Sequence, residues 1–165
     1  MKTYKLLRIK NGVLYPLYVD YSTPLPVGEW LTAKVGEKAD DKHVKSRLGK
    51  LSLRPGYHST KVPFADWIGK RGADGKLYKA PDTVWCECSV CGDQITDIGS
   101  NGMREVPDGW YYFKTNRAQP EPWIVSKHLR IDRILTDEEV DKICREYGWE
   151  PQPLWSEYLK SAATA

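Results

Sequence analysis

The residues best suited to chemistry stand together between Arg54 and Thr60, where the sequence is Arg-Pro-Gly-Tyr-His-Ser-Thr. His58 could act as an acid, a base or a hydrogen-bond donor to a ligand, and Arg54 could hold an anion. Pro55 and Gly56 predict a turn, and a side chain beside a turn is fixed by the scaffold while solvent still reaches it. The structural alternative is a histidine hydrogen-bonded to a turn carbonyl, with Arg54 paired to a surface acid.

Cysteine spacing suggests a second kind of site. Cys86, Cys88 and Cys91 form a C-x-C-x2-C pattern that could supply three thiolates to zinc. No second knuckle of the kind that completes familiar zinc sites follows. In a strand, Cys86 and Cys88 would share one face with neighbouring valines, so the same spacing also fits a buried apolar surface. The candidate fourth zinc ligands are Cys144, His58 and His128.

Aromatic residues supply a third possibility. The chain has 7 Trp and 10 Tyr against only 2 Phe, and Trp and Tyr are enriched where proteins bind partners. Tyr111, Phe113 and Trp123 could stack on a planar base or a nicotinamide ring. Strand alternation would instead place about half of the aromatic side chains in the core.

Composition limits the class of protein. The 165 residues are 41% hydrophobic and 28% charged, which is typical of one soluble globular domain. No apolar run approaches a membrane span, and charges between Met1 and Arg8 interrupt the chain too early for a signal peptide. We therefore expect a cytoplasmic protein. The net charge of +3 does not indicate nucleic acid, whose binding domains carry a concentrated basic stripe.

The elements that must position these residues are mainly strands. Residues 4–10 and 13–19 flank Asn11-Gly12, the strongest short signal for a β-hairpin. Pro16 places the second of these strands at a sheet edge, because proline has no N–H to donate. The further predicted strands are 30–35, 48–53, 83–90, 110–114, 123–125 and 129–135.

Two helices complete the prediction. A short helix near 63–69 would begin at Pro63, and a C-terminal helix at 137–147 carries the capping box Thr136/Glu139 before it ends at Gly148. This order predicts a compact α+β fold with a single domain over 1–150. A tail at 151–165 is expected to pack in part and then to fray.

Most of the chain resembles an uncharacterised family that is associated with phages and mobile elements of gut bacteria, where it can also sit inside very large multi-domain proteins. The segments that carry the resemblance are 54–58, 84–88, 112–116, 123–125 and 133–140. The resemblance implies a phage or mobile-element origin. Because the sequence holds no complete catalytic motif, as is common in small domains of that origin, we expect a small cytoplasmic protein that binds and modulates a host or defence protein. Its Trp and Tyr surface would then make the contact.

A second resemblance points to an enzyme. Tyr57-His58-Ser59-Thr60 is similar to the aromatic-His-Gly-Thr/Ser signature of the ADP-ribosyltransferase fold, and 121–125 is similar to its Glu-Tyr-Ile-Val strand. The chain departs from that pattern at Ser59 and at Pro122. The resemblance implies that His58 binds NAD and that Glu121 stabilises the oxocarbenium-like transition state, with Arg54 nearby. The residues that would then contact the cofactor are Ser59, Thr60, Tyr111, Tyr112 and Trp123.

Overall fold

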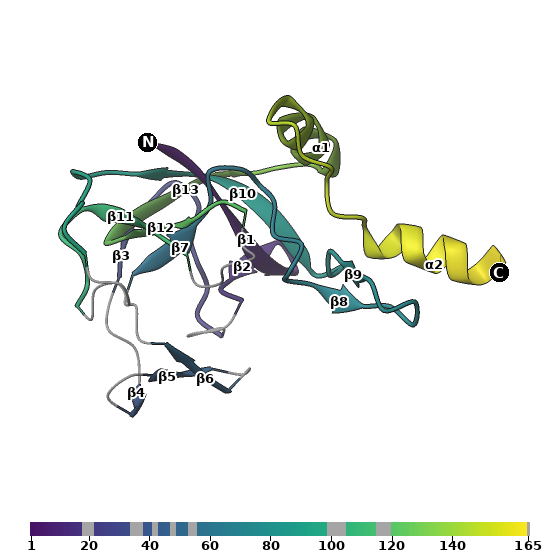
Figure 1. Ribbon diagram of the computed structural model, residues 1–165, viewed down its shortest axis with the longest axis horizontal. Coiled ribbons are helices and arrows are strands. Elements are labelled where there is room, and N and C mark those ends of the chain that lie inside the picture. The colour runs from purple at the N-terminus through teal and green to yellow at the C-terminus, as the bar shows by residue number, and fades with distance from the viewer. Residues whose placement is uncertain are drawn as a thin grey trace.

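The computed structural model describes residues 1–17, 22–33, 38–40, 43–46, 49–52, 56–98, 105–114 and 120–164. Antiparallel strands dominate, and two helices follow them near the C-terminus (Figure 1). The prediction of a compact α+β domain is confirmed. Neither helix in the described ranges is long and apolar enough to cross a membrane. Arg54, a predicted site residue, lies outside the described residues.

A five-stranded antiparallel sheet forms the centre of the molecule, in the order β2-β1-β10-β13-β3. β1 pairs with β10 along a register that runs from Lys2 opposite Ser89 to Arg8 opposite Thr83. The predicted hairpin joins β1 to the edge strand β2 through Asn11 and Gly12, whose φ values of 52° and 78° suit a tight turn. The strands are β1 (Lys2–Lys10), β2 (Val13–Tyr15), β3 (Trp30–Thr32), β10 (Thr83–Val90) and β13 (His128–Ile134).

A three-stranded sheet in the order β11-β12-β7 lies beside the central sheet. A pair of backbone hydrogen bonds, Tyr4 N to Thr60 O at 2.8 Å and Thr60 N to Tyr4 O at 2.6 Å, joins the end of β7 to β1. Its strands are β11 (Trp110–Phe113), β12 (Trp123–Ser126) and β7 (Tyr57–Ser59). The smaller sheets contain β4 (Lys38–Asp40), β5 (His43–Ser46), β6 (Gly49–Ser52), β8 (Lys70–Arg71) and β9 (Leu77–Tyr78).

Helix α1 (Asp137–Glu146) begins at the predicted capping box. The Thr136 hydroxyl accepts from the Glu139 backbone N–H, and the Glu139 side chain accepts from the Thr136 N–H, each at 3.1 Å. Val140 and Cys144 face the sheet and pack in one cluster with residues of β1 and β10. Helix α2 (Trp155–Thr164) extends away from the central sheet, on the side of β8 and β9, and carries the C-terminus at its tip (Figure 1).

Two local predictions differ from the structure. Residues 63–69 form successive turns rather than a helix, because Phe64 N donates to Val62 O at 2.7 Å, two residues back, and Ile68 N to Ala65 O at 3.1 Å. Val62 and Ala65 are both buried, so the core holds this segment in a non-helical path. The tail at 151–165, predicted to pack in part and then to fray, contains the regular helix α2, whose Trp155 and Tyr158 contact Tyr78.

The hydrophobic core occupies both faces of the central sheet. On one face Tyr4, Leu6 and Trp85 pack with α1 and with the turns at 62–68. On the other face, Leu7 packs with Cys86 and with inward-facing residues of β13. Tyr111, Phe113 and Val125 form a third cluster on the three-stranded sheet β11-β12-β7. Strand alternation explains this division, because adjacent residues of β1 and β10 point to opposite faces.

Candidate functional site

The turn before β7 sets the position of His58. Gly56 has a φ of 142°, and a Cβ there would lie 2.8 Å from Val125 Cγ1, so only glycine lets β7 approach β12 this closely. His58 then lies opposite Val125 in the register. Its Nδ1 is 3.3 Å from Gly56 O, and its own carbonyl accepts from Lys5 Nζ at 2.6 Å. The turn-carbonyl contact is the one that the structural alternative predicts.

His58 is the first ring of a continuous row of aromatic side chains. Its ring contacts Trp123 edge-to-face at 5.8 Å between centroids, and Trp123 contacts Trp67 in the same way at 5.9 Å. Trp67 contacts Phe64 at 6.5 Å, and Phe64 contacts Trp149 at 5.0 Å. All five side chains are half-buried. We call this set, His58-Trp123-Trp67-Phe64-Trp149, the aromatic row.

A small hollow lies at the far end of the row from His58. Its volume is about 10 Å³, and the rings of Phe64, Trp67 and Trp149 line it together with Glu121. Glu121 is half-buried, and no hydrogen bond or ion pair of its carboxylate occurs among the described residues. His58 and Glu121, two of the predicted catalytic residues, therefore lie at different places along the aromatic row: His58 is its first ring, and Glu121 lines the hollow.

The side chains predicted to bind a cofactor do not gather around His58. The Ser59 hydroxyl donates to Ile124 O at 3.5 Å, and the Thr60 hydroxyl lies 2.6 Å from Val62 O; both residues are buried. Tyr111 is 0% exposed, so it offers no ring face to a nicotinamide. Tyr112 is 36% exposed and projects from the opposite face of β11. Trp123 alone of the five belongs to the aromatic row.

The clustered cysteines lie in two different environments. Cys86 and Cys88 are fully buried on the inner face of β10, and burial raises the pKa of both thiols to about 12. Cys91 is exposed, whereas Cys144 is buried and donates to Pro63 O at 3.3 Å. Within the described ranges, no group of three His, Cys, Asp or Glu side chains could hold a metal ion. Cys86 and Cys88 thus occupy the buried apolar surface that was the alternative to zinc.

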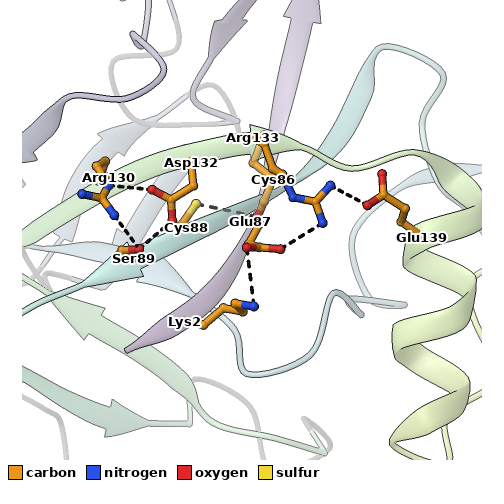
Figure 2. Close-up of polar contacts among 9 residues, drawn as sticks. All are labelled: Lys2, Cys86, Glu87, Cys88, Ser89, Arg130, Asp132, Arg133 and Glu139. Atoms are coloured by element: carbon orange, nitrogen blue, oxygen red, sulfur yellow. Dashed lines mark hydrogen bonds and ion pairs between the residues drawn. The ribbon is translucent and has the colours of Figure 1, made fainter.

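Paired charges lie on the α1 side of the central sheet, beside the buried cluster of that face (Figure 2). Glu87 accepts from Arg133 at 3.2 Å and lies 3.6 Å from Lys2. Arg133 also binds Glu139, so the network ties α1 to β10 and β13. Because each of these charges has an opposite partner, the network is suited to holding the helix in place. A second group on the same face joins Ser89, Arg130 and Asp132.

A larger cleft, of about 350 Å³, lies between α1 and the segment that leads into α2. Arg145 pairs there with Asp141 at 2.9 Å and with Glu150 at 3.5 Å. Lys79 lies 3.8 Å from Asp137, and burial lowers the pKa of Lys79. Most charged groups of this cleft thus neutralise one another, whereas Glu121 at the aromatic row stands without an ionic partner among the described residues.

No family model, curated protein or solved structure matched the chain. The aromatic row includes three residues that sequence reasoning did not assign to a site. Phe64 and Trp67 fit the predicted apolar face of a helix, and Trp149 follows α1. The signal that could have found them is the high tryptophan content, which is typical of binding surfaces.

Proposed function

We propose that this protein is a binding module whose aromatic row docks a partner protein. The observation that carries the proposal is the chain of ring contacts from His58 to Trp149, in which every ring keeps part of its surface exposed. Tryptophan and tyrosine dominate the residues that contribute most to protein association. Rings that already pack against one another also lose little side-chain entropy when a partner binds.

The proposed partner is a bacterial host or defence protein that is met in the cytoplasm. The resemblance to phage and mobile-element proteins supports this class, and the half-buried histidine and tryptophans supply the contact surface. The sheets contribute a rigid base, because β7 and β12 pair directly beneath Trp123 and His58. A rigid, preformed surface favours association, since less freedom is lost on binding.

Capture of partners from a bacterial lysate tests the docking surface. We expect Trp123→Ala, which removes the ring between His58 and Trp67, to weaken the captured interaction by about 30-fold or more, as for other interface hot spots. Trp30→Ala is the matched control, because Trp30 is 46% exposed and stands outside the row. Circular dichroism must show that both variants are folded. Equal capture by Trp123→Ala and the unsubstituted protein would contradict the proposal.

The transferase alternative has one observation in its favour: His58 and Glu121 border the same aromatic row. It is tested by incubating the purified protein with NAD and measuring released nicotinamide. Turnover that disappears in His58→Ala and in Glu121→Gln would support a transferase and overturn the non-enzymatic proposal. Turnover that survives both substitutions would indicate a contaminating enzyme.

A further inference from the structure

We propose that the hollow at the Phe64–Trp149 end of the aromatic row binds the ammonium group of a lysine side chain on the partner protein. This inference rests on the proposed docking function and names the chemical group that the row recognises. Three features of the described residues support it: the inclination of the rings, the lone carboxylate and the size of the hollow.

The rings that line the hollow are set at angles to one another. The Phe64 and Trp67 planes are inclined by 72°, and the Phe64 and Trp149 planes by 40°. Inclined rings surround a bound group from several directions, as in the aromatic cages that hold ammonium ligands. The negative face of each ring attracts a cation within about 6 Å of its centroid, and tryptophan attracts it most strongly.

Charge complementarity comes from Glu121. Glu121 is half-buried, lines the same hollow as Phe64, Trp67 and Trp149, and makes no ion pair with a described residue of this chain. Between described residues, the cation–π contacts occur at other rings, for example Lys70 over Trp155 at 4.3 Å and Arg130 over Trp30 at 5.0 Å. An incoming ammonium would therefore gain both a charged hydrogen bond and ring contacts.

The size of the hollow selects among cations. A volume of about 10 Å³ accommodates one group the size of a water molecule. An ammonium is a compact point charge of that size, whereas a guanidinium is a larger planar fork. A trimethylated ammonium is also larger. Pro120 and Val62, which lie beside the rings, offer apolar surface to the methylene stem that follows a lysine ammonium.

The direct test uses Nα-acetyl-lysine methylamide as the probe, with NMR of the tryptophan indole N–H groups as the readout. We expect saturable shifts of Trp67 and Trp149 at probe concentrations up to about 0.1 M, while Trp30 stays unchanged. The matching Nε-acetyl-lysine and arginine compounds should bind at least about tenfold more weakly, because they lack the compact charge. No saturable shift, or an equal response to the Nε-acetyl compound, would overturn the inference.

Variants separate the contributions of charge and ring. Glu121→Gln keeps the shape of the side chain and should weaken the lysine probe by about tenfold, the usual effect of losing one charge-assisted hydrogen bond. Trp149→Leu keeps an apolar wall but removes a ring, so it should also weaken the probe. Glu157→Gln is the matched control, because Glu157 is exposed and lines the larger cleft between α1 and α2 rather than the hollow. Unchanged binding by Glu121→Gln would contradict the proposed role of the carboxylate.

Failure of this inference can be told apart from failure of the docking proposal. If Trp123→Ala loses its captured partner but the lysine probe shifts neither Trp67 nor Trp149, the docking function stands and the lysine site is excluded. If the probe binds in a manner that depends on Glu121 while Trp123→Ala captures partners normally, the lysine site stands and the docking surface is excluded.

Discussion

Lys5 lies on β1 with its ammonium against the backbone of the turn that carries His58. Its Nζ donates to His58 O at 2.6 Å, which links β1 to β7 through a side chain. Burial lowers the pKa of Lys5 to about 8, although the nearby Cys86 and Cys88 act in the opposite direction. Lys5 therefore helps to position His58, the first ring of the aromatic row, through the backbone and not through contact with a ligand.

The lowered pKa makes the stability conferred by Lys5 depend on pH. Below pH 8, Lys5 is protonated in the folded and unfolded states, and the cost of burying its charge is fully present. Between pH 8 and 10.5 the folded state has lost the proton that the unfolded state still binds, so the free energy of unfolding rises with pH. Relative to Lys5→Met, the unsubstituted protein should gain up to about 3 kcal/mol across this window.

Urea unfolding of both proteins at pH 7 and again near the upper end of the window measures this difference. Groups other than Lys5 titrate alike in the two proteins, so their contributions cancel in the comparison. Parallel pH dependence of the two unfolding free energies would show that Lys5 titrates normally in the folded state.

His58 shows how far single residues can be interpreted from the sequence. The Pro55-Gly56 signal predicts a turn beside His58 because turn preference is a local property of the backbone. Gly56 precedes β7 with a φ of 142°, and Pro55 lies outside the described residues. Its neighbours could not be predicted, since Trp123 reaches it through strand register and Trp67 through a segment held by the core. Glu121 was singled out, but the hollow it lines depends on Trp149, which follows α1.

At the scale of elements, predictions succeeded where the signal was local. The bounds of β10 follow its two-residue alternation, and α1 begins where Thr136 and Glu139 form a capping box. The helix prediction for 63–69 was wrong because burial of Val62 and Ala65 overrides the helical spacing of the aromatic residues in this segment. Helix α2 was missed because tertiary contacts with Tyr78 support it, and no local pattern in the sequence reveals them.

The capping box of α1 can be tested by itself. Thr136→Ala removes the hydroxyl that accepts from Glu139 N at 3.1 Å, so we expect a loss of about 1 kcal/mol in the free energy of unfolding. Thr136→Ser retains the hydroxyl and should lose much less. Urea denaturation measures both values, and an equal loss in the two variants would assign the effect to the threonine methyl group instead.

At the scale of the whole molecule, the aromatic row is assembled from three separate parts of the chain. The first part, β7 and the turns after it, supplies His58, Phe64 and Trp67. The second part, β12, supplies Trp123, and the third part is Trp149, which follows Gly148. The positive φ of Gly148, 78°, ends α1 and turns the chain back toward Phe64. The proposed docking surface therefore requires the central fold together with α1.

Helix α2 stands apart from that surface, extending beyond β8 and β9 (Figure 1). Trp155 and Tyr158 contact Tyr78, with ring centroids 6.1 and 5.1 Å away, and Lys70 lies over the Trp155 ring. These contacts hold α2 against the β8-β9 hairpin rather than against the aromatic row. The helix should therefore contribute to stability without contributing to binding.

Removal of residues 155–165 tests this separation. Loss of two aromatic pairs with Tyr78 should cost about 2 kcal/mol, which corresponds to a fall of about 4–8 °C in the melting temperature of a chain of this size. Trp155→Ala should reproduce much of that fall, whereas Leu159→Ala, at a residue that is 53% exposed, should not. The shortened protein should still unfold cooperatively and give the same indole shifts at Trp67 and Trp149 with the lysine probe. Loss of those shifts from a folded, shortened protein would mean that α2 supports the aromatic row, through contacts beyond those it makes with the β8-β9 hairpin.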